Sequence, residues 1–290
     1  MSSSAKVHRE SRWPRSRVGR RLGITSRAGL ALVVGLLFLF PLYVAWVTSL
    51  DTAAHVFTVP PHLVPDFDFN AYRRVWHMAR WLMYLGNSAF ITTATLAIAL
   101  SSSVLSAYAF SFLRFKGSNA VFMGILVVLM IPAEALLIPN YVILQVFHLL
   151  NTYWAQILPY GASVFGVFLL RQSFLSLPNS YWEAAKLDGA SHLRFLWSVA
   201  LPLAKPALFT IGLYIFIGCW NAFQWPLIVT TSHSVQPIEV AVSRLMMAHS
   251  VDWRRLSAAG IMTTFPLVIA FFILQRHIVR GISRGEGLQE

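Results

Sequence analysis

The stretch LPNSYWEAAKLDGASHLRFLWSVALPLAKP, from Leu177 to Pro206, separates two strongly apolar runs of this chain. It is too polar to cross a bilayer as a single helix and too short to form a domain of its own. We therefore expect it to lie at a membrane surface between two spans. Its capping and turn residues should fix its shape.

The first half of this loop carries start and stop signals for a short helix. Ser180 is followed three residues later by Glu183, which is the spacing of a capping box at a helix N-terminus. Gly189 can adopt the left-handed backbone conformation that commonly ends a helix. The pattern predicts a helix that begins at Ser180 and stops at Gly189.

The second half predicts another short helix, set at an angle to the first. Ser191 can cap a helix that runs through Arg194 to Val199. Pro202 should stop that helix, because proline lacks a backbone N–H and its ring clashes with the preceding turn. Pro206 then stands where a proline costs little, in the first turn of the next span.

The composition of the whole chain indicates that lipid is its main solvent. Of its 290 residues, 57% are apolar and only 12% are charged, whereas a soluble domain carries about 25% charged residues. The single cysteine, Cys219, lies in an apolar run and can form neither a disulfide framework nor a Cys-rich metal site.

Six apolar runs are long enough to predict transmembrane helices, since about 20 apolar residues cross a bilayer. The predicted spans are Ala28–Val47, Phe90–Phe112, Ala120–Ile138, Ala155–Leu170, Ala207–Val229 and Leu256–Leu274. The fold class is therefore an all-α membrane protein, with a basic arm at 1–27, a six-helix domain at 28–280 and a tail at 281–290. A five-span count is the alternative, because the fourth run is short.

The net charge of +12 comes from residues beside the spans, which is typical of topology signals and lipid headgroup contact rather than of nucleic-acid binding. With six spans, four basic groups share one side: Lys6, Arg9, Arg12, Arg15, Arg17, Arg20, Arg21 and Arg27; Arg114 and Lys116; Arg171, Lys186, Arg194 and Lys205; Arg276, Arg280 and Arg284. This predicts that both termini are cytoplasmic, and a five-span count loses the agreement. Six further arginines fall on the opposite side: Arg73, Arg74, Arg80, Arg244, Arg254 and Arg255.

Motifs for catalysis and for nucleotide or metal binding are absent from the sequence. There is no G-x-x-x-x-G-K-[ST], no H-E-x-x-H and no G-x-S-x-G. The nine histidines are scattered, and no pair is spaced four apart. We therefore expect no catalytic residue, no metal ligand and no cofactor on this chain.

The loop also carries a longer pattern, E-A-A-x-x-D-G-A followed by L-P-x-x-x-P. Its matching positions are Glu183, Ala184, Ala185, Asp188, Gly189, Ala190, Leu201, Pro202 and Pro206. With FPLYVAWVTSL, LLNTYWAQILPY, FLLRQSF, WNAFQWPLIVT and QRHIVRGI elsewhere, the chain resembles permease subunits of ABC importers, from about Phe40 to Gly281. The resemblance is strongest to the smaller permease of carbohydrate systems of the maltose type.

This resemblance implies a type I importer permease fold in a bacterial or archaeal plasma membrane. It implies a second permease subunit, two separate ATPase subunits that hold ATP and Mg, and an extracytoplasmic binding protein. The loop would supply two coupling helices that dock on an ATPase, with Glu183 facing a basic residue there. The substrate would be a sugar, an oligosaccharide or a polyol phosphate such as glycerol 3-phosphate.

Polar residues within the spans are candidates for the substrate path. Glu134 lies between Pro132 and Pro139, and a carboxylate at the bilayer centre costs about 2.5–3.5 kcal/mol unless it meets a partner or water. We expect Glu134, Asn140 and Tyr141 to line the path, or Glu134 to reach the interface instead.

A second set of path candidates lies in the fifth span. Its amides and indoles suit sugar hydroxyls and sugar rings: Trp220, Asn221, Gln224 and Trp225. Interhelical packing is the alternative role for this set.

Two other functions remain compatible with the residues alone. A secondary carrier would show repeats and broken helices in both halves, and no repeat is evident. A membrane scaffold without transport activity would have no ATPase partner.

Overall fold

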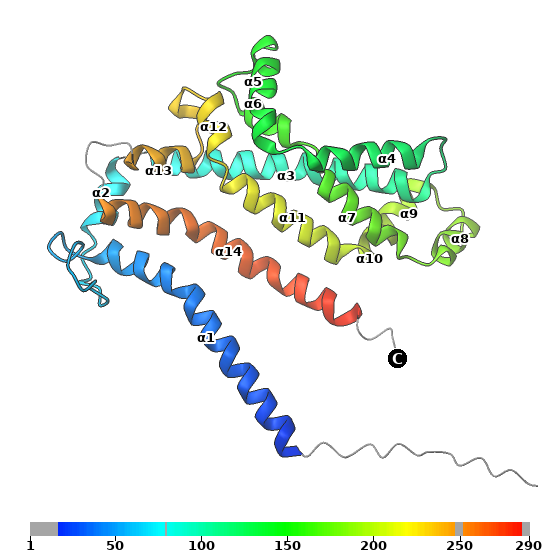
Figure 1. Cartoon of the computed structure of the whole chain (residues 1–290). Helices are drawn as coiled ribbons and strands as arrows, with labels where there is room; N and C mark the ends of the chain where they lie inside the picture. The colour runs from blue at the N-terminus through cyan, green and yellow to red at the C-terminus, as the bar shows by residue number, and fades with distance from the viewer. Residues whose placement is uncertain (1–16, 79, 247–251, 286–290) are drawn as a thin grey trace, which may run out of the picture.

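The computed structural model describes residues 17–78, 80–246 and 252–285, and this part of the chain is helical, with no strand. The N-terminal end of the basic arm, residues 1–16, and the last five residues of the predicted tail lie outside the described residues. Figure 1 shows an elongated bundle with α2 and α13 at one end and α8, α9 and α10 at the other.

Three helices are long and apolar enough to cross a membrane unbroken. They are α1 (Arg17–Leu50), α3 (Trp81–Phe112) and α14 (Trp253–Gly285), and their apolar parts contain the predicted first, second and sixth spans. α1 begins within the predicted arm at 1–27, and α14 continues into the predicted tail.

The predicted third and fourth spans correspond to bent pairs of helices, and a further bent pair joins His192–Leu203 to Lys205–Trp220. The bundle has up to six spans if each pair counts as one. α4 (Ser118–Val127) and the turn Val128–Met130 meet η2 (Ala133–Leu136) and α5 (Leu137–Val146) at 99°. The predicted span Ala120–Ile138 is therefore not one continuous helix. Pro132, with φ −63° and ψ 136°, takes an extended conformation that the helix cannot include.

The predicted fourth and fifth spans are interrupted in the same way. α6 (Tyr153–Ile157) and η3 (Leu158–Tyr160) meet α7 (Val164–Leu175) at 41°. α11 (Lys205–Trp220) ends three residues before α12 (Gln224–Val229), so the predicted helix Ala207–Val229 is not continuous.

The core lies where α3 packs against α7 and α11. Small residues permit this approach, since a Cβ added at Gly166 would lie 2.6 Å from Oγ of Ser103. α14 packs on α11 and α1, and most of the apolar surface of α1 is exposed, as expected of a helix that faces lipid.

The end of the bundle opposite α8 is closed by α2 (Asn70–Met78), η5 (His233–Val235) and α13 (Ile238–Met246). Asn87 of α3 contacts the segment that joins α12 to α13: its side-chain amide donates to the carbonyls of Ser234 (2.9 Å) and Gln236 (2.8 Å). Its Oδ1 accepts from the hydroxyl of Tyr153 at 2.8 Å. All hydrogen-bonding groups of this buried amide are thus satisfied.

Candidate functional site

The loop from Leu177 to Pro206 begins with α8 (Asn179–Leu187), whose N-cap is Pro178 and has no side-chain cap. The predicted capping box is therefore wrong, since Ser180 already lies inside the helix. The reason is that Pro178 fixes the extended backbone before the helix, and its carbonyl accepts from the N–H of Tyr181 (3.1 Å). Glu183 is exposed, and among the described residues it has no hydrogen-bond or ion-pair partner.

Gly189 ends α8 as predicted, with a φ of +73°. The N–H of Ala190 donates to the carbonyl of Ala185 (2.9 Å), and the N–H of Gly189 donates to that of Lys186 (3.1 Å). This pair of hydrogen bonds is the Schellman motif, in which the left-handed residue turns the chain away from the helix axis. Asp188 is the exposed residue at the turn.

The second helix begins as predicted, because Oγ of Ser191 accepts from the N–H of Arg194 at 3.3 Å. It starts with α9 (His192–Phe195), however, and continues through a π-helical turn (Leu196–Ala200) into α10 (Leu201–Leu203).

Pro202 therefore does not stop the helix, and that prediction was wrong. The π turn gives a physical reason, since the N–H of Leu201 donates to the carbonyl of Leu196 across the wider turn. Such a turn relieves the clash that a proline makes with the turn before it. The chain bends by 81° at Ala204, where α11 starts with Pro206 in its first turn.

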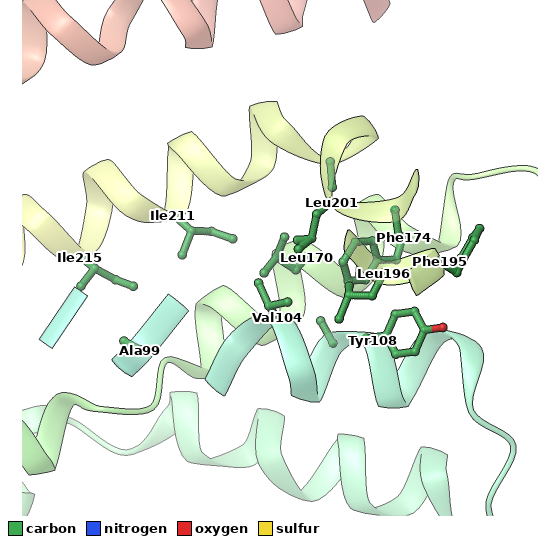
Figure 2. Packing of buried hydrophobic residues seen from close by; sticks show 13 residues of the cluster. Ala99, Val104, Tyr108, Leu170, Phe174, Phe195, Leu196, Leu201, Ile211 and Ile215 are labelled. Atoms are coloured by element: carbon green, nitrogen blue, oxygen red, sulfur yellow. The ribbon is translucent and has the colours of Figure 1, made fainter. Parts of the chain in front are cut away.

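Aromatic side chains fasten the loop to the bundle. The ring of Trp182 stacks on His192, with centroids 4.4 Å apart, and Nδ1 of His192 is hydrogen-bonded to the hydroxyl of Tyr108 at 2.8 Å. Figure 2 shows Tyr108 of α3 beside Phe174 and Phe195, which are both fully buried. This aromatic anchor could not be predicted from the sequence, because its members are up to 87 residues apart (195 − 108) and meet only in the fold.

The far side of the loop is exposed and mixes charged with apolar groups. Leu187 is 89% exposed, and Leu193 and Trp197 are 63% and 67% exposed. Beside them stand exposed Glu183 and Lys186, whereas Ala185 and Leu201 pack on the core. Ala184 is exposed and Ala190 is half-buried, so neither fills the space between the helices. A surface of this kind, on a firmly packed base, is typical of a protein-binding site.

A cavity of about 640 Å³ lies where the broken helices meet. Its polar lining comes from η2, η3, α11, α12 and the N-cap of α7: Glu134, Tyr160, Ser163, Tyr214, Gln224 and Trp225. Glu134 and Gln224 are exposed to it, and no Lys or Arg is among its described lining residues.

The other predicted path residues lie elsewhere. Asn140 and Tyr141 are half-buried on α5 and do not line this cavity, and neither does exposed Asn221. Trp220 is buried, and its Nε1 donates to the carbonyl of Thr263 (3.1 Å), which holds α11 to α14. Trp225 lines the cavity, and its Nε1 is fixed on the carbonyl of Ala155 (3.0 Å).

Two further hollows open at the end of the bundle that carries α2 and α13. One, of about 630 Å³, is lined by Asn70, Arg73, Arg74, His77 and Arg255. The other, of about 590 Å³, includes Arg80, Tyr84, His233 and Arg244 in its lining. Both would attract anions, because one sign of charge predominates in a concave surface.

Comparison with known proteins agrees with this architecture. A sequence model of the binding-protein-dependent transport system inner membrane component matches residues 99–284. The sn-glycerol-3-phosphate transport system permease protein UgpE of Yersinia enterocolitica is 34% identical over 280 residues, covering 93% of this chain and 99% of the relative. The protein of the same name from Pectobacterium atrosepticum is 30% identical over 285 residues, with the same coverage.

A solved structure is similar in fold. It is a chain of a bacterial ABC transporter involved in the import of the acidic polysaccharide alginate, with a TM-score of 0.76 and 28% identity over 90% of this chain and 98% of that one. The family model matches well over half of the chain, and the relatives match along nearly their whole length. This chain belongs to the inner membrane components of binding-protein-dependent transport systems, and it is a transport subunit rather than an enzyme.

Proposed function

We propose that this chain forms, with a second permease subunit, the path of an ATP-driven importer for a carbohydrate-type substrate. Two separate ATPase subunits would bind ATP and Mg, and a binding protein would deliver the substrate at the end that carries α2 and α13. A solved structure of similar fold is a bacterial alginate ABC transporter in complex with an alginate pentasaccharide-bound periplasmic protein, and such a partner would suit this chain.

The observation that carries this proposal is the contrast between the two sides of the loop. The aromatic side is locked on α3 through Trp182, His192 and Tyr108, while Glu183 and Leu187 project outward. A loop that is packed firmly on one side can transmit a displacement to the bundle without changing its own conformation. We propose that α8 and α9 are coupling helices that dock on an ATPase subunit.

The loop is directly connected to the cavity. After the 81° bend, α11 carries Ile215, Ile217 and Gly218, which line the cavity wall. A displacement of α8 and α9 would therefore tilt α11 and reshape the cavity. In this mechanism, ATP binding closes the ATPase pair, and the bundle turns from inward-facing to outward-facing.

The orientation follows from the same assignment. If α8 and α9 meet an ATPase, they lie in the cytoplasm of a bacterial or archaeal cell. α1 begins and α14 ends away from α2 and α13 (Figure 1), so both termini would lie on the cytoplasmic side. The basic groups counted along the sequence agree with this orientation.

For the substrate we propose an anionic carbohydrate, such as a polyol phosphate. The two arginine-lined hollows would attract an anion at the entrance. The named functions of the relatives, glycerol 3-phosphate and alginate transport, concern anionic molecules of this class. Glu134 would repel an anion in the cavity, so its charge would have to be met by the second permease.

The coupling role is tested by Glu183→Lys and Gly189→Asp in the assembled importer, with Lys116→Glu as control. Lys116 is exposed in the α3–α4 loop, so its reversal is a two-unit charge change of opposite sign to Glu183→Lys, made outside the coupling loop. We expect both loop variants to reach the membrane and to abolish uptake, while the control transports normally. Normal uptake in either loop variant would refute the docking role.

The substrate class is tested with the importer reconstituted in vesicles with its binding protein. We expect ATP-dependent uptake of glycerol 3-phosphate or an acidic oligosaccharide, in preference to glycerol and maltose. Preference for the neutral compounds would refute the anionic class. Uptake driven by an ion gradient without ATP would establish a secondary carrier, and failure to co-purify with an ATPase would favour a scaffold.

A further inference from the structure

The segment between α1 and α2 gathers two imidazoles and two carboxylates that the transport mechanism above does not use. Nδ1 of His55 lies 2.7 Å from Oδ2 of Asp66, and Nδ1 of His62 lies 3.3 Å from Oδ1 of Asp51. The two imidazole rings are 4.5 Å apart, measured between centroids. One ligand atom from each of His55, His62 and Asp66 lies within 4.8 Å of the other two.

The carboxylate of Asp66 is held in place before any ligand arrives. Its Oδ2 accepts from the backbone N–H of Thr52 (2.9 Å) and from the Thr52 hydroxyl (2.7 Å). These hydrogen bonds, followed by that of His55, lower the pKa of Asp66 well below its usual range.

Asp51 has a different position, directly after the last residue of α1. Its side chain is only 4% exposed, and it faces Nδ1 of His62. A buried carboxylate that receives one ring N–H of a histidine leaves the other ring nitrogen free and fixes its direction. His62 is thus oriented in the way that metal-binding histidines generally are.

We propose that His55, His62 and Asp66 bind a zinc ion, with Asp51 as the carboxylate that orients His62. Two imidazole nitrogens and one carboxylate oxygen are a common zinc donor set, and water completes the tetrahedron at such sites. Calcium and magnesium are disfavoured, because they prefer oxygen ligands only.

The three ligand atoms lie within 4.8 Å of one another and would have to adjust to the spacing that a bound ion requires. Zinc bonds of about 2.0–2.2 Å place tetrahedral ligand atoms roughly 3.4 Å apart. The side chain of His55 is 44% exposed and that of His62 32% exposed, so both can move inward. No metal ligand was expected from the sequence, because only pairs of histidines four residues apart were considered. The folded segment instead combines two histidines seven positions apart (62 − 55) with Asp66.

The ion would fasten the connection between two membrane helices. Asp51 follows α1, and Asn70 starts α2, while the N–H of Asp68 already donates to the carbonyl of Leu50 at 2.8 Å. A metal that joins residues 55, 62 and 66 would hold this whole segment in one conformation. This goes beyond the proposed transport function and does not depend on it.

The test uses the complete chain, purified within its importer complex in detergent and stripped with a chelator. We then dialyse it against zinc and measure bound zinc by mass spectrometry, for the wild type, His62→Ala and Asp66→Asn. His77→Ala is the matched control, because His77 is exposed on neighbouring α2. We expect His62→Ala and Asp66→Asn to hold one zinc ion fewer per chain than the wild type and the control.

Equal zinc content in all four proteins would overturn the proposal. A second measurement avoids relying on variants that fold poorly: cobalt added to the stripped wild type should give the intense visible absorption of a tetrahedral site. Absence of these bands from the wild type would also overturn it. Neither readout involves uptake, so a failure here leaves the transport assignment unaffected.

Discussion

The proposed coupling loop and the cavity are both interruptions of the helical bundle, but they are built in different ways. The loop Leu177–Pro206 is shaped by neighbours in sequence, through the Schellman turn at Gly189 and the cap at Ser191. The cavity is shaped by breaks far apart in sequence, at Pro132 and after Trp220. We therefore expect the loop to be rigid and the cavity to be more adaptable.

The side chains of the two regions differ accordingly. Trp182 and His192 are stacked, and His192 is hydrogen-bonded to Tyr108. Phe195 also packs on Tyr108 and Phe112, so several contacts hold the loop on α3. Glu134 and Gln224 are exposed, and among the described residues neither has a hydrogen-bond partner. Polar groups left unengaged in a cavity are available to a substrate.

The largest effect is expected from Gly189→Val. A branched residue at a φ of +73° costs about 1–3 kcal/mol, which would distort or melt the end of α8. We expect uptake to fall at least about tenfold, with the protein still present in membranes. Gly117→Val is the matched control: Gly117 has a φ of +82°, and both glycines have open space around them. Equal loss in both variants would show general instability rather than failed coupling.

A smaller effect is expected in the cavity from Gln224→Ala. Loss of one hydrogen bond to a substrate costs about 0.5–1.5 kcal/mol, so KM should rise about two- to tenfold. Asn140→Ala is the control, because Asn140 was predicted beside the path and does not line the cavity. If Asn140→Ala raises KM as much as Gln224→Ala, the path does not follow this cavity.

The attachment of the loop to α3 is tested by Tyr108→Phe, which keeps the ring and removes the hydrogen bond to His192. About 1 kcal/mol of support for the loop should be lost, so that more ATP is hydrolysed per molecule imported, by up to about fivefold. Tyr43→Phe removes a comparable bond, from the hydroxyl to the carbonyl of Leu63 (2.6 Å), at the opposite end. An unchanged ratio in Tyr108→Phe would mean that the hydrogen bond does not support coupling.

The smallest effect is expected from Glu134→Gln. Removal of one negative charge from a solvated cavity changes the energy of a nearby anion by about 1 kcal/mol or less. Uptake of an anionic carbohydrate should rise relative to a neutral one, by no more than about fivefold. A shift in favour of the neutral compound would contradict the electrostatic role of Glu134.

The sequence was sufficient for the features that depend on neighbouring residues. The long apolar runs predicted α1, α3 and α14, and the turns at Gly189 and Ser191 were predicted correctly. Ser180 was wrongly predicted to start the helix, because Pro178 caps it two residues earlier. Pro202 was wrongly predicted to stop the next helix, because a π turn accommodates the proline.

Features that depend on distant residues could not be predicted in this way. The anchor joins Tyr108 to His192, and the cavity joins Glu134 to Gln224. Nothing in local periodicity encodes which helices face each other, so Asn140 and Tyr141 were predicted beside the path from sequence proximity to Glu134 alone. Trp220 and Trp225 illustrate the same point, since their hydrogen bonds to Thr263 and Ala155 are visible only in the fold.

The central claim is that the exposed tip of α8 touches an ATPase subunit. Leu187→Cys, at the 89% exposed position, can be introduced in a Cys219→Ser background, which removes the only native cysteine. A thiol cross-linker of short reach is then added to the assembled importer, with Leu63→Cys, exposed near α2, as the control. We expect a cross-link from position 187 to the ATPase, changed in yield by ATP, and none from position 63. No cross-link from position 187 in a complex that transports would contradict it.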